Sequence, residues 1–90
     1  MIKHVMIDIM KENNKIYENI IKILKEQCNE MYNHMESLRL FKCENVLVEV
    51  KLFTNHLLVD LIGECDRLLD NIIEILPKTS ILIRLVERGF

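Results

Sequence analysis

Two groups of side chains in this 90-residue sequence have the types and spacing that could bind a metal ion or support acid–base chemistry. Glu30 and His34 are four residues apart, and His56, Asp60 and Glu64 repeat the same interval. On a helix, residues four apart share one face, so each group could present imidazole and carboxylate ligands together. Di-iron bundles, however, use inward-facing Glu-x-x-His motifs, and these side chains lie off the predicted apolar faces. We therefore predict no metal site, no cofactor and no enzymatic activity.

The three cysteines are the other candidates for chemistry. Cys28, Cys43 and Cys65 lack the short Cys-x-x-Cys spacing of redox and zinc sites. An odd number of cysteines and no recognisable signal peptide predict reduced thiols in the cytoplasm. Richness in Asn, Ile and Lys is typical of AT-rich genomes, and a viral source would make this the host cytoplasm. Cys28 and Cys65 are expected to be buried, and Cys43, in a predicted turn, to be accessible.

The elements that would position these residues are read from hydrophobic spacing. Apolar residues recur at alternating steps of four and three between residues 17 and 38, which is the heptad pattern of a coiled coil. The positions are Tyr17, Ile21, Leu24, Cys28, Met31, Met35 and Leu38. This pattern predicts a long helix over 15–41. A helix over 2–12 precedes it in the same register, with a break or a register-fixing polar residue at Asn13 and Asn14.

The segment 46–53 allows two interpretations. Val46, Val48 and Val50 alternate with other residues as they would in a strand. Val46, Val50 and Phe53 also lie on one stripe of a helix. A lone strand needs a partner, and few other segments show strand patterning, so we favour the helix.

With that choice, the second half of the chain is predicted to form a helix over 45–76 and a short last helix over 80–88. Pro77 ends the first of these, because the residue before proline is disfavoured in the helical region. Gly63 falls within the predicted helix, where a close helix crossing would explain it. The alternative is a small α+β protein with strands near 2–9, 46–53 and 81–86.

We therefore predict an all-α protein, a single helical domain over residues 1–90, built on an antiparallel helical hairpin. A turn near residue 43 would place Ile21 opposite Cys65 and Leu24 opposite Ile62, so that apolar residues face each other. Both long helices carry apolar faces wider than one partner helix would cover. A homodimer that forms a four-helix bundle would bury the excess.

The expected function is that of a non-enzymatic, self-associating protein-interaction module, such as an adaptor, a small chaperone or an inhibitor of a larger protein. Its predicted self-association or partner interface comprises Ile16, Ile20, Ile23, Met31, Met35, Leu38, Ile81, Leu82, Leu85 and Phe90. An acidic docking face for a basic partner is predicted at Asp60, Glu64, Asp70 and Glu74. The partner itself is not specified by these residues.

Net charge argues against two other classes of partner. The chain carries 12 Lys and Arg against 14 Asp and Glu, so it lacks the basic excess that phosphate-backbone binding needs. No apolar run approaches the length of a membrane-spanning helix, so neither nucleic acid nor membrane is expected as a partner. The alternative function is a dimeric nucleic-acid-binding regulator that uses the basic flank of the first helix, formed by Lys11, Lys15, Lys22 and Lys25.

Overall fold

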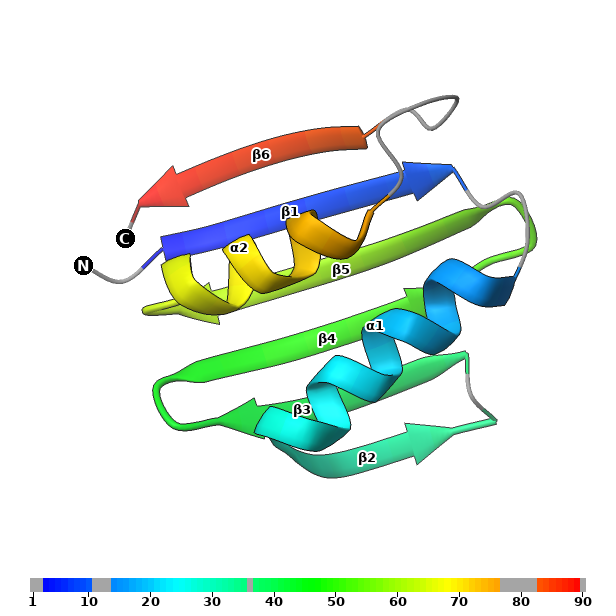
Figure 1. Cartoon of the computed structure of the whole chain (residues 1–90), viewed down its shortest axis with the longest axis horizontal. Coiled ribbons are helices and arrows are strands. Elements are labelled where there is room, and N and C mark those ends of the chain that lie inside the picture. Colours follow the sequence, from blue (N-terminus) through cyan, green and yellow to red (C-terminus); the bar gives the residue numbers. More distant parts are fainter. Residues whose placement is uncertain (1–2, 11–13, 36, 77–82, 90) are drawn as a thin grey trace.

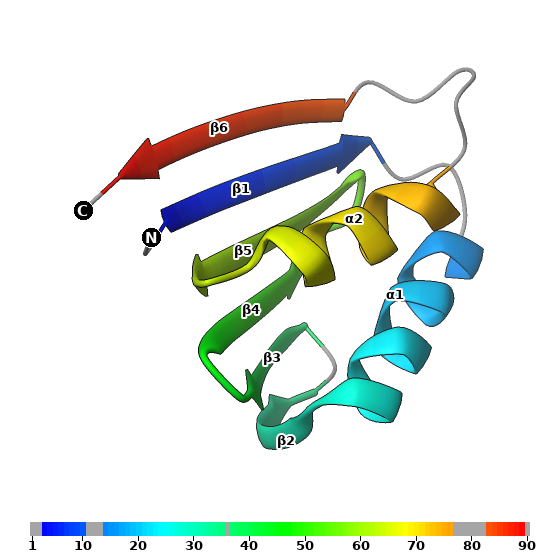
Figure 2. The same ribbon diagram turned by 60° about the vertical axis from the view of Figure 1, so that its left-hand side comes forward.

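The protein folds as an antiparallel β-sheet with two α-helices packed on one face, shown in Figures 1 and 2. The computed structural model describes residues 3–10, 14–35, 37–76 and 83–89. Their elements in chain order are β1 (Lys3–Met10), α1 (Asn14–Gln27), β2 (Asn29–His34), β3 (Leu38–Cys43), β4 (Val46–Leu52), β5 (His56–Gly63), α2 (Asp66–Ile75) and β6 (Ile83–Gly89). The class is therefore α+β.

The sheet has six strands in the order β2-β3-β4-β5-β1-β6. Strands β2 to β5 follow one another as antiparallel hairpins, whereas β1 lies between β5 and β6, with Val5 opposite Leu61 on one side and Glu87 on the other. Helix α1 covers the β3–β4 side of the sheet and α2 covers the β5–β1 side (Figure 1). Strands β2 and β6 are the two edges.

The core lies between the helices and the sheet. Every second residue of the three central strands is buried there, namely Val5, Ile7 and Ile9, Val46, Val48 and Val50, and Leu57, Val59 and Leu61. The helices contribute Ile16, Tyr17, Ile20, Ile21 and Leu24 from α1 and Leu68 and Ile72 from α2. The alternate residues of the strands and the helically spaced residues of α1 and α2 thus pack together in one largely aliphatic layer.

The prediction of a long helix over 15–41 is wrong beyond residue 27. The first part of the heptad pattern is a true helix face, because Tyr17, Ile21 and Leu24 are buried in the core. Beyond Gln27 the chain forms β2, and all six residues of that strand are exposed. Of the apolar residues at helical spacing there, Met31 and Met35 are exposed, so the pattern that suggested a coiled coil is not a buried helix face. The helix predicted over 2–12 is likewise strand β1 over its described part.

The predicted helix over 45–76 is also wrong, because residues 46–63 form β4 and β5 and only Asp66–Ile75 is helical. In β5 the residues facing the helices are apolar and the alternating ones include Leu58 and Ile62. Apolar residues on both faces of a strand remove the alternation that would have revealed it. The all-α fold, the helical bundle and the coiled coil are therefore all excluded by the structure.

The last helix predicted over 80–88 is replaced by β6, which pairs antiparallel with β1. Pro77 and the start of that predicted helix lie outside the described residues. Strands β1, β4 and β6 lie where the α+β alternative placed strands near 2–9, 46–53 and 81–86, but three more strands join them. The four-helix bundle dimer cannot form from this fold.

Gly63 ends β5 at a point of close backbone approach rather than at a helix crossing. Its φ is +128°, a region that side chains with a Cβ atom rarely adopt. A Cβ atom here would lie 2.0 Å from the carbonyl oxygen of Asn45. That same oxygen accepts a hydrogen bond of 3.2 Å from the backbone N–H of Glu64. Glycine therefore lets the β3–β4 turn and the end of β5 lie against each other.

Candidate functional site

The β2–β3 hairpin displays the largest group of exposed apolar side chains near one another in the described sequence. Met31 is 63% exposed, Tyr32 47% and Met35 85%. Leu38 and Leu40 of β3 are half-buried on the sheet face away from the helices, where Leu40 pairs with Tyr32. We call these five residues the hairpin patch. Exposed apolar groups of this kind mark surfaces that bind other proteins.

Edge strand β2 also lacks the charges that commonly protect sheet edges. Its outer side faces no strand among the described residues, so its outward backbone groups are available for pairing. The sequence Asn29–His34 contains no Lys, Arg or Pro, and its single carboxylate, Glu30, is bound to Arg39. The other edge, β6, carries two arginines and a glutamate. A register shift between Glu30 and Tyr32 divides the pairing of β2 with β3 into two parts, with Glu30 opposite Phe41 before it and Tyr32 opposite Leu40 after it.

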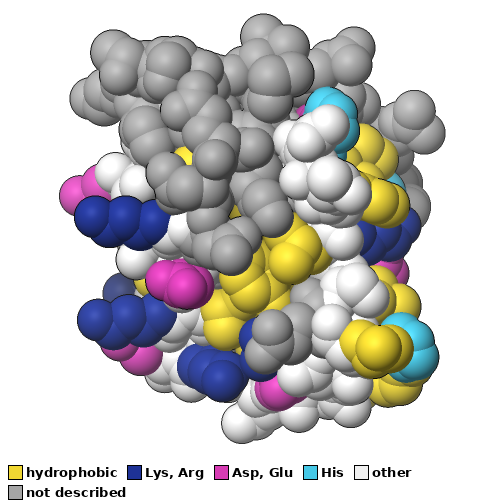
Figure 3. All heavy atoms as spheres, turned by 90° about the vertical axis from the view of Figure 1, so that its right-hand side faces the viewer, with side chains coloured by type: hydrophobic (Ala, Val, Ile, Leu, Met, Phe, Trp, Pro, Cys, Tyr) yellow, Lys and Arg dark blue, Asp and Glu magenta, His cyan; other side chains and the backbone are white. Residues whose placement is uncertain are grey.

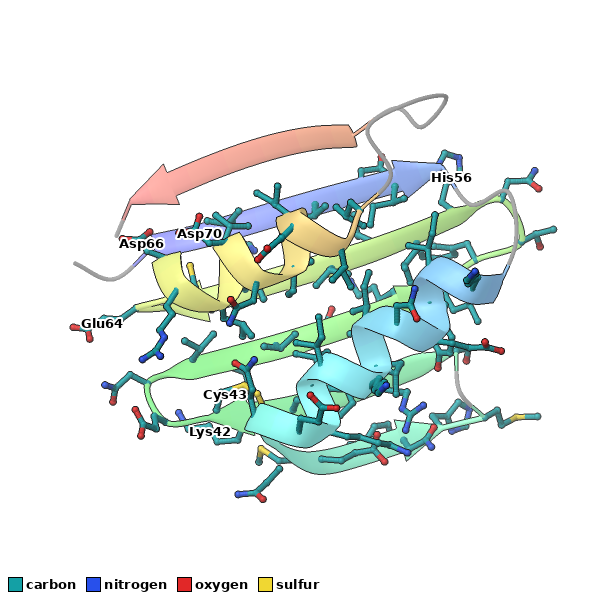
Figure 4. The ribbon with its side chains drawn as sticks, in the orientation of Figure 1. Lys42, Cys43, His56, Glu64, Asp66 and Asp70 are labelled. Carbon is teal, nitrogen blue, oxygen red and sulfur yellow. A yellow bond between two sulfur atoms is a disulfide. The ribbon has the colours of Figure 1, made fainter. Side chains whose placement is uncertain are left out.

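A disulfide joins Cys28, at the end of α1, to Cys43, at the end of β3. The bridged sulfur atoms lie beside the labelled Cys43 in Figure 4. The expectation of reduced thiols is thus not met by this pair. Cys28 is half-buried like Cys43, whereas Cys65 is fully buried, as expected for a core thiol. The bridge closes a loop that contains the whole hairpin patch, so it ties that surface to α1.

A buried polar cluster lies behind the hairpin, on the helix side of the sheet. Arg39 of β3 is only 5% exposed. Its Nε donates to Glu30 of β2 at 2.7 Å, and its Nη1 donates to the hydroxyl of Tyr17 on α1 at 3.2 Å. The guanidinium carbon also lies 5.7 Å from the ring centre of Phe41. One side chain thereby links the edge strand, the helix and the core.

The charge of Arg39 is held by its partners. Burial alone would lower the pKa of Arg39, but the hydrogen bonds with Tyr17 and Glu30 outweigh burial and raise that pKa above its usual value. The guanidinium therefore stays protonated at physiological pH. A permanent positive charge lies just beneath the surface between α1 and β3.

The two groups considered as possible metal ligands, Glu30 with His34 and His56 with Asp60 and Glu64, are not brought together by the fold. Glu30 faces the helices and binds Arg39, whereas the His34 ring stacks on Tyr32 with the ring centres 6.3 Å apart. His56 lies 3.3 Å from Asp8, across strands β5 and β1. Within the described ranges, no three His, Cys, Asp or Glu side chains lie close enough together to hold a metal ion.

The residues predicted to form an interface fall into three environments. Ile16 and Ile20 are buried in the core, and Ile23 packs partly against it. Met31, Met35 and Leu38 belong to the hairpin patch. Leu85 lies in β6 opposite Ile7, and Ile81, Leu82 and Phe90 lie outside the described residues. The other two residues of the hairpin patch, Tyr32 and Leu40, were not predicted because the segment was read as helix.

The predicted acidic face is split between two places. Asp60 lies on β5, 7% exposed, on the sheet face away from the helices, where its Oδ1 is 3.3 Å from Nε2 of His4. Glu64, Asp70 and Glu74 are exposed on α2 and the turn before it. Figure 4 shows Glu64, Asp66 and Asp70 gathered around the start of α2. Asp66, in the first turn of α2, is favoured there by the helix dipole.

On the basic flank, Lys15, Lys22 and Lys25 are exposed on α1, and Lys11 lies outside the described residues. No helix among the described residues is long and apolar enough to cross a membrane. Comparison with protein-family models and with curated proteins finds no match.

Proposed function

We propose that the chain is a non-enzymatic protein-interaction module that associates with a second copy of itself through the hairpin patch. The supporting observation is that one hairpin contains both an edge strand without Lys, Arg or Pro and the exposed side chains of Met31, Tyr32 and Met35. Edge strands of this composition pair with other chains unless something covers them.

A second copy fits this surface better than a charged partner does. Around a twofold axis, each copy presents the same residues to the other. The patch of one copy can therefore bind the patch of the other only if like charges do not meet. Met31, Tyr32, Asn33 and Met35 carry no charge, and the charge of Glu30 is bound by Arg39 within the chain. Methionine side chains adapt their shape easily, which helps two identical surfaces to fit.

The proposal keeps the cytoplasm as the compartment, and this has a consequence for the cysteines. Disulfides are rare in the reducing cytosol, so the Cys28–Cys43 pair would exist there largely as thiols and would form the bridge under oxidation. Rapid acid quenching of cells, alkylation and mass spectrometry would measure the bridged fraction. A fully bridged pair in unstressed cells would place the protein in an oxidising compartment.

Light scattering during size-exclusion chromatography tests the self-association. We expect the wild-type protein to elute at twice its monomer mass of 10.7 kDa and to dissociate on dilution. The double variant Met31→Lys, Tyr32→Lys should elute as a monomer with an unchanged circular dichroism spectrum. A wild-type monomer at high concentration would overturn the proposal.

Phe53→Lys provides the matched control. Phe53 is 53% exposed, comparable to Met31 and Tyr32, but it lies in the connection between β4 and β5. Its substitution should leave the dimer intact. Dissociation of the dimer by Phe53→Lys, but not by the hairpin variant, would place the interface elsewhere. Duplex DNA that bound with a steep salt dependence would instead favour the nucleic-acid regulator.

A further inference from the structure

A groove runs between α1 and the sheet at the end of the molecule that faces the viewer in Figure 3. Its volume is about 450 Å³, and it is lined by Tyr17, Glu18, Ile21, Lys22 and Lys25 of α1 together with Arg39 and Leu52. We call it the α1 groove. In Figure 3, hydrophobic side chains run along the middle of this surface, and Lys or Arg and Asp or Glu side chains border them. The volume lies within the range of small-molecule sites.

We propose that the α1 groove binds a small amphiphilic anion, a molecule with a short apolar or aromatic body and one carboxylate or phosphate group. This inference does not depend on the proposed self-association, because the groove lies on the helix side of the sheet and the hairpin patch does not line it.

The floor of the groove supplies an anion-binding group that is already in position. The contacts of Arg39 with Glu30 and Tyr17 use three of its N–H bonds, and a guanidinium has five. Each terminal nitrogen therefore carries one further N–H that can donate to an incoming oxyanion. Because Arg39 is 5% exposed and held by these contacts, little side-chain entropy is lost on binding.

The rim adds positive charge above that floor. Lys22 and Lys25 are three residues apart on α1, so their side chains emerge on the same side of the helix. Together with Arg39 they place three cations on the lining against one carboxylate, Glu18. Both lysines are exposed, so their ammonium groups can move toward a bound anion. The charge pattern therefore complements an anion rather than a cation or a neutral ligand.

The wall of the groove is apolar and would contact the apolar body of the ligand. Ile21 is 6% exposed and the Tyr17 ring 7% exposed, and half-buried Leu52 faces them from the end of β4. Half-buried Leu52 keeps apolar surface in contact with water there, and an apolar body placed between it and the nearly covered Tyr17 and Ile21 would displace that water. A bare inorganic anion would gain nothing from this wall.

A second hollow has a different charge pattern. It has a volume of about 480 Å³ beside the β3–β4 turn and is lined by residues that include Glu44, Glu64 and Arg67. Two carboxylates against one guanidinium give it the opposite balance of charge. The combination of a buried guanidinium, two lysines and an apolar wall therefore distinguishes the α1 groove from it.

Titrations followed by heteronuclear NMR spectra of the ¹⁵N-labelled protein test this inference. The probes are phenyl phosphate, phenylacetate and inorganic phosphate. Phenyl phosphate or phenylacetate should shift the amide signals of Tyr17, Ile21 and Leu52 at lower concentration than inorganic phosphate does. Whichever of the two binds more tightly identifies the anionic group. Absence of saturable shifts at these three amides with both organic anions would overturn the proposal.

The double variant Lys22→Gln, Lys25→Gln should weaken binding of the better probe by about fivefold, the effect expected from two solvent-exposed charge contacts. Lys42→Gln is the matched control, because Lys42 is also an exposed lysine but lies on β3 and does not line the groove. Its affinity should remain within about twofold of wild type on the same grounds. Equal losses in the two variants would show a general charge effect and refute the site.

Discussion

Arg39 and Glu30 form an ion pair that joins the buried side of β3 to the edge strand β2, with Nη2 of the arginine 2.5 Å from Oε2 of the glutamate. The side chain of Arg39 is 6% exposed and that of Glu30 28% exposed. Strand β2 contributes no residue to the buried core. This pair, together with the Cys28–Cys43 bridge next to the start of β2, therefore helps to hold β2 against the rest of the described structure.

Substitution of Glu30 by Gln should destabilise the protein by about 1–3 kcal/mol. The change leaves the nearly buried charge of Arg39 without its carboxylate, and the partial exposure of Glu30 places the cost below that of a fully buried pair. Urea unfolding followed by circular dichroism measures the loss. Glu49→Gln is the control, because both members of its pair with Lys51 are partly exposed, unlike Arg39, and the pair should contribute less than about 1 kcal/mol. Equal losses of stability in the two variants would show that burial of Arg39 adds nothing to the contribution of its ion pair.

Reduction of the Cys28–Cys43 bridge should lower the free energy of unfolding by about 3 kcal/mol, the chain-entropy value for a loop of this length. Urea midpoints with and without dithiothreitol give the difference. The double variant Cys28→Ser, Cys43→Ser should match the reduced protein and should not respond to dithiothreitol. If dithiothreitol shifts the variant as well, the effect comes from something other than this bridge.

Substitution of Gly63 by Ala should cost about 2–4 kcal/mol. The added Cβ atom would meet the carbonyl oxygen of Asn45, and alanine would have to adopt a φ of +128°. Thermal and urea unfolding measure the loss of stability. The neighbouring exposed residue Glu64 serves as the comparison, since Glu64→Ala should change stability by less than about 0.5 kcal/mol. If Gly63→Ala left the free energy of unfolding unchanged, the close approach of the β3–β4 turn to the end of β5 would be contradicted.

Two adjacent leucines test the strand assignment of residues 56–63. Leu57 is 0% exposed and faces the helices, whereas Leu58 is half-buried on the opposite face. Leu57→Ala should cost about 3 kcal/mol, within the range for core leucines, and Leu58→Ala about 1 kcal/mol. Urea unfolding of the two variants provides the comparison. Similar losses would contradict the alternation of faces along β5.

The parts of the fold that could be predicted are those in which one pattern fits one element. In α1, Tyr17, Ile21 and Leu24 are spaced for a helix and are buried as a helix face, so periodicity was sufficient there. In β4, Val46, Val48 and Val50 showed the correct alternation, but a compatible helical stripe ran through the same residues. Choosing between them required the neighbouring strands, which the pattern of one segment does not contain.

The remaining elements could not be predicted, for physical reasons. Strand β5 carries apolar residues on both faces: Leu57, Val59 and Leu61 lie under the helices, and the half-buried Leu58 and Ile62 lie on the other face. Strand β2 buries none of its residues, so its sequence reflects no core position. The Cys28–Cys43 bridge depends on two residues being opposite each other at the end of the β2–β3 ladder. The sequence separation of the two cysteines does not indicate that they are opposite each other.

The central place of β1 in the sheet has a consequence for how the chain reaches its native state. His4 pairs with Ile62 on one side and with Arg88 on the other, so both neighbours of β1 lie far along the sequence. During synthesis, β1 leaves the ribosome well before either neighbouring strand does. Pairing over such long loops is slow, and until it is complete both sides of an apolar strand are accessible to other nascent chains. Expression at low temperature and slow synthesis should therefore raise the yield of correctly folded protein.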